Sequence, residues 1–334
     1  MEKRPCGKSG IDVSVVGIGA WAYGGGEDDY WGAQDQTDVE AVVNAALDRG
    51  INYFDTAEAY NGGRSEESLG RALGPRRHEA IIGSKISPNN TEPSVLREHC
   101  DASLRRLGTD YIDIYFVHWP IAKHPVQDAF DTLAALQSEG KIRSIAVSNF
   151  GARDLTEALE TGARIDVNQL CYNLVSRAIE FEIVPLCRQH DIAIFPYMPL
   201  LQGILSGKYA ALDDIPPERT RTRQFSGDRP QSRHGGPGAE DEMIKVLDGM
   251  REISDETGIP MDQLALAWTA AKPGVASVLV GVRNIEQLER NAPAADVHLS
   301  ADLVARLDEL TAPMMHTLGP NADYFQGPEG SRVH

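Results

Sequence analysis

Short apolar segments rich in β-branched residues recur along the chain, and each precedes a longer stretch with the periodicity of a helix. Such segments are apolar on both faces, which is typical of parallel strands covered by helices. We expect strands at eight of them: 13–19 (VSVVGIG), 51–55 (INYFD), 80–85 (AIIGSK), 111–118 (YIDIYFVH), 142–148 (IRSIAVS), 165–169 (IDVNQ), 192–197 (IAIFPY) and 276–281 (ASVLVG).

Between these segments, apolar residues recur every three or four positions, as on the buried face of an amphipathic helix. The stretches 38–50, 94–108 and 126–140 show this pattern, and each ends at a glycine that can cap a helix. In the first stretch, one face carries Val39, Val42, Val43, Ala46 and Leu47.

The alternation predicts a TIM-type (β/α)8 barrel, because eight strand–helix units fit one domain of 334 residues. We expect a small N-terminal hairpin before the barrel, with its turn at Lys8-Ser9-Gly10. A doubly wound open sheet is the alternative, but GIGAWAYGGG after the first strand is not a GxGxxG motif that opens a helix. We therefore expect one domain over 1–334, with an irregular loop at 211–240 and an irregular C-terminal tail.

The formal net charge of −17 and the pI near 4.9 disfavour binding to nucleic acid or to anionic membranes, so a small-molecule partner is expected. No apolar run approaches the roughly 20 residues that span a bilayer, and no signal peptide opens the chain. The four cysteines show neither a CxxC pair nor zinc-ligand spacing. We expect reduced thiols, a cytoplasmic location and no metal site.

Polar or ionisable residues end most of the predicted strands, where the active sites of such barrels lie. Tyr60 follows the second strand by one short loop. A purely structural barrel would show no enrichment of polar residues at its strand ends, so we predict that the active site lies at this end of the barrel. The residues at the strand ends are Asp55, Lys85, His118, Ser148, Asn149, Gln169 and Tyr197.

Tyr60 and three of these strand-end side chains could together transfer a proton. A phenol titrates near pH 10, so Tyr60 needs help to act near pH 7, and a neighbouring Lys85 ammonium is expected to lower its pKa. Asp55 would keep that lysine charged by pairing with it, and His118 could donate to a substrate oxygen or relay a proton.

The chain resembles the aldo-keto reductases over nearly its whole length, through GIGAW, DTAEAYNGGRSEESLG, IIGSK, SLRRLGTDYIDIYFVHWP, GKIRSIAVSNF, NQLCYNL, PYMPLLQGILSGKY and GVRNIEQLERN. The pattern is most similar to the bacterial branch of general-stress and inositol-operon reductases. The resemblance implies hydride transfer between NADP(H) and a carbonyl or alcohol in a (β/α)8 barrel. It identifies Asp55, Tyr60, Lys85 and His118 as the catalytic tetrad, with Tyr60 as general acid and base.

The resemblance also implies where the cofactor is held. The carboxamide would be contacted by Ser148, Asn149 and Gln169, and Tyr197 would stack on the nicotinamide. The resemblance places further cofactor contacts at Ala20, Trp21, Asp55, Pro199, Leu200, Gly203, Leu205, Gly207, Lys208, Arg219, Gly281, Arg283, Gln287 and Asn291. Arg283 would bind the 2′-phosphate at a helix N-terminus, which favours NADP, with NAD(H) as the alternative.

Aromatic residues are predicted to line the substrate pocket: Trp21, Tyr23, Tyr30, Trp31 and Trp119. The glycines and acids of WAYGGGEDDYWG would suit a polyhydroxylated substrate, such as a sugar or polyol, and Tyr324-Phe325 in the tail is expected to cap the pocket.

In DTAEAYNGGRSEESLG, Asn61-Gly62-Gly63 is expected to turn the chain away from Tyr60, and Ser65 to cap the next helix with Glu66 and Glu67 in its first turn. Two other functions stay open. The family that the chain resembles also includes cofactor-binding regulatory subunits of potassium channels, so a binding or sensing role is one alternative. The other is a metal-dependent hydrolase or isomerase, since such enzymes also use this barrel.

Overall fold

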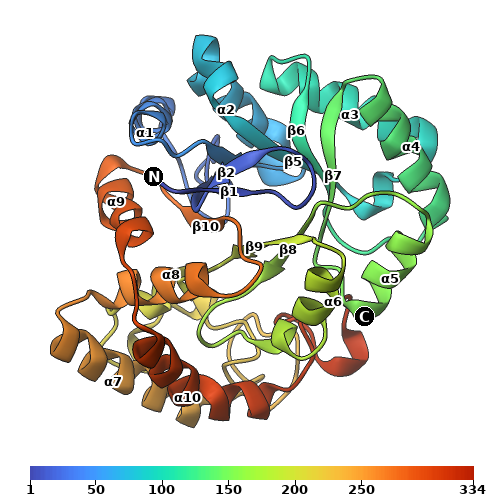
Figure 1. Ribbon diagram of the computed structural model, residues 1–334. Helices are drawn as coiled ribbons and strands as arrows, with labels where there is room; N and C mark the ends of the chain where they lie inside the picture. The colour runs from blue at the N-terminus through green and yellow to red at the C-terminus, as the bar shows by residue number, and fades with distance from the viewer.

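The computed structural model describes residues 1–334 and contains a barrel of eight parallel strands in the order β10-β3-β4-β5-β6-β7-β8-β9 (Figure 1). The eight strands are β3 (Val16–Gly19), β4 (Tyr53–Asp55), β5 (Ile81–Ile86), β6 (Ile112–Val117), β7 (Ile142–Ser148), β8 (Val167–Cys171), β9 (Ala193–Tyr197) and β10 (Val278–Gly281).

The barrel closes between β9 and the residues just before β10. The backbone nitrogen of Ile194 donates to the Gly274 carbonyl oxygen at 2.8 Å, and the Ala276 nitrogen donates to the Ile194 oxygen at 3.1 Å. The predicted (β/α)8 barrel is therefore confirmed, and the open doubly wound sheet is excluded because both edges of the sheet meet.

A helix follows each barrel strand and packs outside the sheet (Figure 1). The three helices predicted from periodicity are present, within two residues of their expected ends. The helices are α1 (Gln36–Asp48), α2 (Arg64–Leu73), α3 (Pro93–Leu107), α4 (Val126–Ser138), α5 (Ala152–Glu160), α6 (Ile183–Gln189), α7 (Glu240–Thr257), α8 (Met261–Ala271), α9 (Ile285–Asn291) and α10 (Ala301–Leu318). None of them is long and apolar enough to cross a membrane.

The predicted N-terminal hairpin is confirmed as β1 (Lys3–Pro5) paired antiparallel with β2 (Asp12–Ser14), and it lies across one end of the barrel (Figure 1). The prediction of one continuous strand over 13–19 is wrong. Its first residues belong to the hairpin, because the backbone nitrogen of Val15 bonds to the Glu2 carbonyl before the chain enters β3.

Two additions stand outside the eight-unit pattern. Helices α7 and α10 pack side by side on the outside of the barrel (Figure 1), and the last residues return to α5, where the Asp154 nitrogen donates to the His334 carbonyl. The loop at 211–240 contains two short 3-10 helices, Leu212–Asp214 and Pro217–Arg219, and is otherwise irregular, as expected.

The apolar core has two parts, as the pattern of doubly buried strands requires. A large cluster of 75 residues fills the space between the strands and the helices. A cluster of 11 residues fills the interior of the barrel and includes Tyr53, Phe116 and Phe195. The packed interior leaves only the strand ends free for a site.

Gly70 sets how closely α2 approaches the C-terminus of α3. A Cβ built on Gly70 would lie 2.3 Å from the Leu107 carbonyl oxygen, and that backbone cannot retreat easily. We expect Gly70→Ala to lower the free energy of unfolding by about 1–3 kcal/mol, measured by urea denaturation. Gly249→Ala in α7 is the matched control, because its Cβ would meet the end of the flexible Leu310 side chain. Equal stability of the two variants would contradict this account.

Candidate active site

Four side chains meet at the C-terminal ends of β4, β5 and β6. The Lys85 Nζ lies 2.6 Å from Asp55 Oδ2 and 3.2 Å from the Tyr60 hydroxyl, and it also donates to the Thr56 carbonyl at 2.8 Å. The rings of Tyr60 and His118 lie edge to face with centroids 5.6 Å apart. The structure therefore brings together the four residues that the sequence identified.

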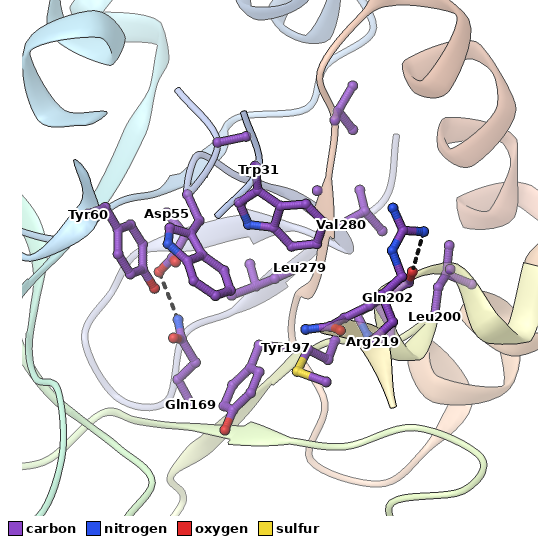
Figure 2. A pocket seen from close by; sticks show the side chains of 18 of the residues that line it. Trp31, Asp55, Tyr60, Gln169, Tyr197, Leu200, Gln202, Arg219, Leu279 and Val280 are labelled. Atoms are coloured by element: carbon purple, nitrogen blue, oxygen red, sulfur yellow. Dashed lines mark hydrogen bonds between the residues drawn. The ribbon is translucent and has the colours of Figure 1, made fainter. Parts of the chain in front are cut away.

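Asp55 is fixed from its other side as well. Its Oδ1 accepts from the Gln169 side-chain amide at 2.7 Å (Figure 2) and from the Tyr53 hydroxyl at 3.2 Å. Both carboxylate oxygens are thus engaged in a buried site, where charge-assisted hydrogen bonds are strong. The pair Asp55–Lys85 is held rigidly beneath Tyr60.

Burial and charge act in opposite directions on the titration of this cluster. Burial lowers the pKa of Lys85, but the attraction of Asp55 and Tyr60 outweighs it, so the pKa is raised and the ammonium persists. Burial raises the pKa of Tyr60, and although Lys85 lowers it as expected, burial outweighs that effect and the pKa lies above its usual value. Burial and the Lys85 charge hold the pKa of His118 well below its usual value, so this imidazole is neutral at pH 7.

The loop after β4 places Tyr60 over the barrel mouth and then turns away. Asn61, Gly62 and Gly63 have φ angles of 50°, 65° and 92°, a left-handed run that glycine adopts at little cost. The predicted cap at Ser65 is wrong, because α2 begins at Arg64 and its N-cap is Gly63, two residues before Ser65. The Ser65 hydroxyl instead donates to the Ala20 carbonyl and bonds to Thr56, tying this loop to the end of β3.

The tetrad opens into a cavity of about 780 Å³ that extends from Tyr60 to the N-terminus of α9. Figure 2 shows Tyr60, Asp55 and Gln169 at one end and Gln202 with Arg219 at the other. A cavity of this size suits a cofactor or drug-sized ligand. Apart from the tetrad members, the predicted residues that line it are Trp21, Trp31, Trp119, Ser148, Asn149, Gln169, Tyr197, Pro199, Leu200, Gly203, Lys208, Arg219, Gly281, Arg283, Gln287 and Asn291.

An amide-rich wall lies at the ends of β7, β8 and β9. The Tyr197 hydroxyl donates to Asn149 Oδ1 at 2.7 Å, and the Asn149 amide donates to Ser148 Oγ at 3.1 Å. Asn149 has a φ of 62°, unusual for a residue other than glycine, and its amide also donates to the His118 carbonyl. This wall offers an aromatic face and polar groups to a flat heterocycle.

Cationic side chains gather toward the other end of the cavity. Arg219 donates to the Gln202 carbonyl (Figure 2) and to the Tyr209 hydroxyl, while the Nε2 of Gln202 is buried without a hydrogen-bond partner. At the start of α9, the Arg283 guanidinium donates to Gln34 and to the Ala33 carbonyl. These donors, on loops after β9 and β10, suit a phosphate-bearing ligand.

Six predicted site residues do not line the cavity: Lys85, which is buried beneath Tyr60, and Ala20, Tyr23, Tyr30, Leu205 and Gly207. Tyr23 and Leu205 are fully buried in the apolar core. The prediction that Tyr23 lines the pocket is therefore wrong, because the turn after β3 leaves its ring fully buried in the core. Tyr30 lies behind Trp21, with which it stacks at 5.3 Å, and its hydroxyl bonds to the Glu218 carbonyl.

The loop acids and the tail also differ from expectation. Glu27 and Asp28 are exposed and Asp29 pairs with Arg64, so the acids do not line the cavity and the idea that they face a polyol is wrong. In the tail, Phe325 lines the cavity as expected, but Tyr324 is buried and accepts a hydrogen bond from the Ala178 nitrogen.

Sequence reasoning missed three residues that shape the site: Tyr53, Gln202 and Arg221. Tyr53 lies two residues before Asp55, so strand alternation places both on the barrel interior and could have revealed it. Gln202 and Arg221 lie in irregular loops, and no periodic signal marks their direction. No group of three or more His, Cys, Asp and Glu residues is placed to hold a metal ion, and all four cysteines are buried and unpaired.

A phenol, an ammonium, a carboxylate and an imidazole thus surround one mouth of the barrel. This arrangement is that of a barrel enzyme with an acid–base site. The family model "Aldo/keto reductase family" matches residues 15–312, and the chain belongs to this family.

Curated relatives cover most of the chain. A probable voltage-gated potassium channel subunit beta of Arabidopsis thaliana is 31% identical over 89% of this chain and 92% of its own length. The NADH-specific methylglyoxal reductase of Escherichia coli is 33% identical over 90% of this chain and 95% of its own length. Among solved structures, an aldo-keto reductase of Klebsiella pneumoniae in complex with NADPH is 28% identical, covers 100% of this chain and 99% of that one, and has a TM-score of 0.74.

Proposed function

We propose that this protein is an NADP(H)-dependent oxidoreductase that interconverts a carbonyl compound and its alcohol, with Tyr60 as general acid and base. The observation that carries the proposal is the buried chain from Asp55 through Lys85 to the Tyr60 hydroxyl, with a neutral His118 beside it. Its substrate is an aldehyde, a ketone or an open-chain sugar. The chain acts as a single domain over 1–334.

The chain's own residues supply the proton transfer. In reduction, Tyr60 donates its hydroxyl proton to the carbonyl oxygen, and the neutral His118 donates a hydrogen bond that orients the same oxygen. The Lys85 ammonium stabilises the phenolate left on Tyr60, and Asp55 keeps the lysine charged. In oxidation, the phenolate takes the alcohol proton. A bound nicotinamide supplies or accepts the hydride.

The residues present fit a dinucleotide phosphate. The aromatic and amide wall of Tyr197, Asn149 and Ser148 suits a nicotinamide, and the buried, unpartnered Nε2 of Gln202 is free to donate to a phosphate oxygen. A Klebsiella pneumoniae relative of known structure binds NADPH, whereas the Escherichia coli relative is NADH-specific. We propose NADP(H) for this chain on the strength of Arg283, with NAD(H) as the alternative.

Replacing Arg283 with Ala should weaken NADPH binding about 10- to 100-fold and leave NADH binding nearly unchanged, because only NADPH carries the 2′-phosphate. The measurement is a fluorescence titration of each cofactor against both proteins. Arg71→Met, on the exposed face of α2, is the control for loss of one positive charge. Equal weakening of NADPH and NADH would contradict the assignment of Arg283.

Within the family, we place the chain in the bacterial branch of general-stress and inositol-operon reductases, supported by the motif pattern in its sequence. The plant relatives named as channel subunits favour one competing function, a cofactor-binding sensor with little turnover. NADPH oxidation with a panel of aldehydes, ketones and sugars separates the two. Tight cofactor binding without turnover of any carbonyl would favour the sensor.

A further inference from the structure

Arg221 stands out among the half-buried cations that line the cavity, because the protein leaves it unpaired. Its Nε is buried without a hydrogen-bond partner, and no carboxylate lies within ion-pair distance of its guanidinium. An unpaired guanidinium removed partly from water is costly unless a ligand compensates it. The chain has a net charge of −17, so carboxylates are plentiful, yet none pairs with this arginine.

Two aromatic rings lie against this guanidinium. Its central carbon is 4.5 Å from the ring centroid of Tyr30 and 5.4 Å from that of Phe325. Cation–π contacts of this kind orient the guanidinium but do not use its N–H donors in hydrogen bonds. The planar fork is therefore preorganised for a bidentate acceptor.

The same stack of rings links Arg221 to the catalytic tyrosine. Tyr30 stacks on Trp21 with ring centroids 5.3 Å apart and planes within 3°, and Trp21 lies 5.9 Å from the Tyr60 ring. Arg221, Trp21 and Tyr60 all line the one cavity. The rings of Tyr30 and Trp21 therefore lie between the guanidinium and the ring of Tyr60, the proposed proton donor.

The other half-buried cations of the cavity are already engaged. Arg219 donates to Gln202 and Tyr209, and Arg283 donates to Gln34 and Ala33. Arg332, which is exposed, is paired with the buried Asp323 while it lies over Trp119. Among the half-buried arginines of the cavity, only Arg221 both lies against two aromatic rings and keeps its donors free.

We propose that Arg221 determines substrate specificity by binding an anionic group, a carboxylate or a phosphate, at the end of the substrate remote from the carbonyl. This inference rests on the proposed carbonyl reduction. The two intervening rings require several bonds between the carbonyl at Tyr60 and the anion at Arg221. The preferred substrates are then anionic carbonyl compounds of several carbons, rather than neutral sugars.

The first experiment compares matched substrates of the wild-type enzyme with NADPH. The ω-oxo acids 4-oxobutanoate, 5-oxopentanoate and 6-oxohexanoate are each paired with butanal, pentanal and hexanal, and glyceraldehyde 3-phosphate is paired with glyceraldehyde. We expect kcat/KM to favour the anionic member of at least one pair about 10- to 100-fold, the range of a charge-assisted hydrogen bond. The arms distinguish a carboxylate from a phosphate.

The second experiment repeats the comparison with Arg221→Met and Arg221→Lys, with Arg71→Met as the control for charge. Arg221→Met should remove the preference for the anionic substrate by raising its KM, while kcat/KM for the neutral aldehydes and the Kd of NADPH stay unchanged. Arg221→Lys should keep part of the preference. A loss of NADPH affinity that affects all substrates equally would overturn the inference and make Arg221 a cofactor contact. Equal kcat/KM within every pair of the wild-type enzyme would overturn it as well.

A binding measurement separates failure of this inference from failure of the proposed function. Hexanoate and hexanamide are titrated against the NADPH-loaded protein, with quenching of tryptophan fluorescence as the readout. Hexanoate should bind more tightly than hexanamide, and Arg221→Met should abolish the difference even if no carbonyl compound is turned over. Equal binding of the two by the wild-type protein would contradict the role of Arg221 whatever the activity.

Discussion

Tyr60→Phe is expected to reduce kcat/KM for carbonyl reduction by about 100- to 10,000-fold, while NADPH binds with unchanged affinity. The substitution removes the proton donor and one hydrogen bond to Lys85, but the ring and its contact with Trp21 remain. Steady-state kinetics with NADPH, beside a fluorescence titration of the cofactor, measures both quantities.

Tyr111→Phe is the matched control, because its ring lies against Arg77 and Arg143 outside the cavity. It should retain wild-type activity. The pKa of Tyr60, raised by burial, keeps the hydroxyl protonated at neutral pH, so wild-type reduction should persist there and alcohol oxidation should rise with increasing pH. Substantial activity of Tyr60→Phe would mean that another group donates the proton.

How far the sequence predicts this site depends on whether a residue lies in a periodic element. Asp55, Lys85 and His118 lie within one residue of a strand end, so the barrel geometry predicts that they meet at one mouth. Tyr60 follows Asp55 by one short loop, so the sequence places it near the same mouth, although no strand register fixes the direction of its ring. The barrel itself followed from alternation alone.

The errors have physical causes of the same kind. Ser65 has the chemistry of a helix cap, but Gly63 is the N-cap and Ser65 lies in the first turn of the helix, where its hydroxyl is turned toward the Ala20 carbonyl. The lowering of the Tyr60 pKa by Lys85 was expected, but the larger opposing effect of burial was not, because the burial of a side chain is not known without coordinates. Arg221 lies in an irregular loop, and only the folded chain shows that the rings of Tyr30 and Phe325 lie against it.

Lys85→Met is expected to lower both stability and activity, because it leaves the Asp55 carboxylate buried without its counter-charge. We expect the free energy of unfolding in urea to fall by about 3–5 kcal/mol, the usual cost of breaking a buried pair from one side. Carbonyl reduction should fall by at least about 100-fold, since no ammonium stabilises the phenolate.

The double variant Asp55→Asn/Lys85→Met separates these two effects. It removes the orphaned charge but not the catalytic defect, so stability should recover substantially while activity stays low. Lys85 lowers the pKa of Tyr60 against the effect of burial, so without Lys85 this pKa rises further. Oxidation requires the phenolate, which forms above that pKa. Residual alcohol oxidation in both variants should therefore begin to rise at higher pH than in the wild type, and an unchanged pH profile would exclude Lys85 as the residue that tunes Tyr60.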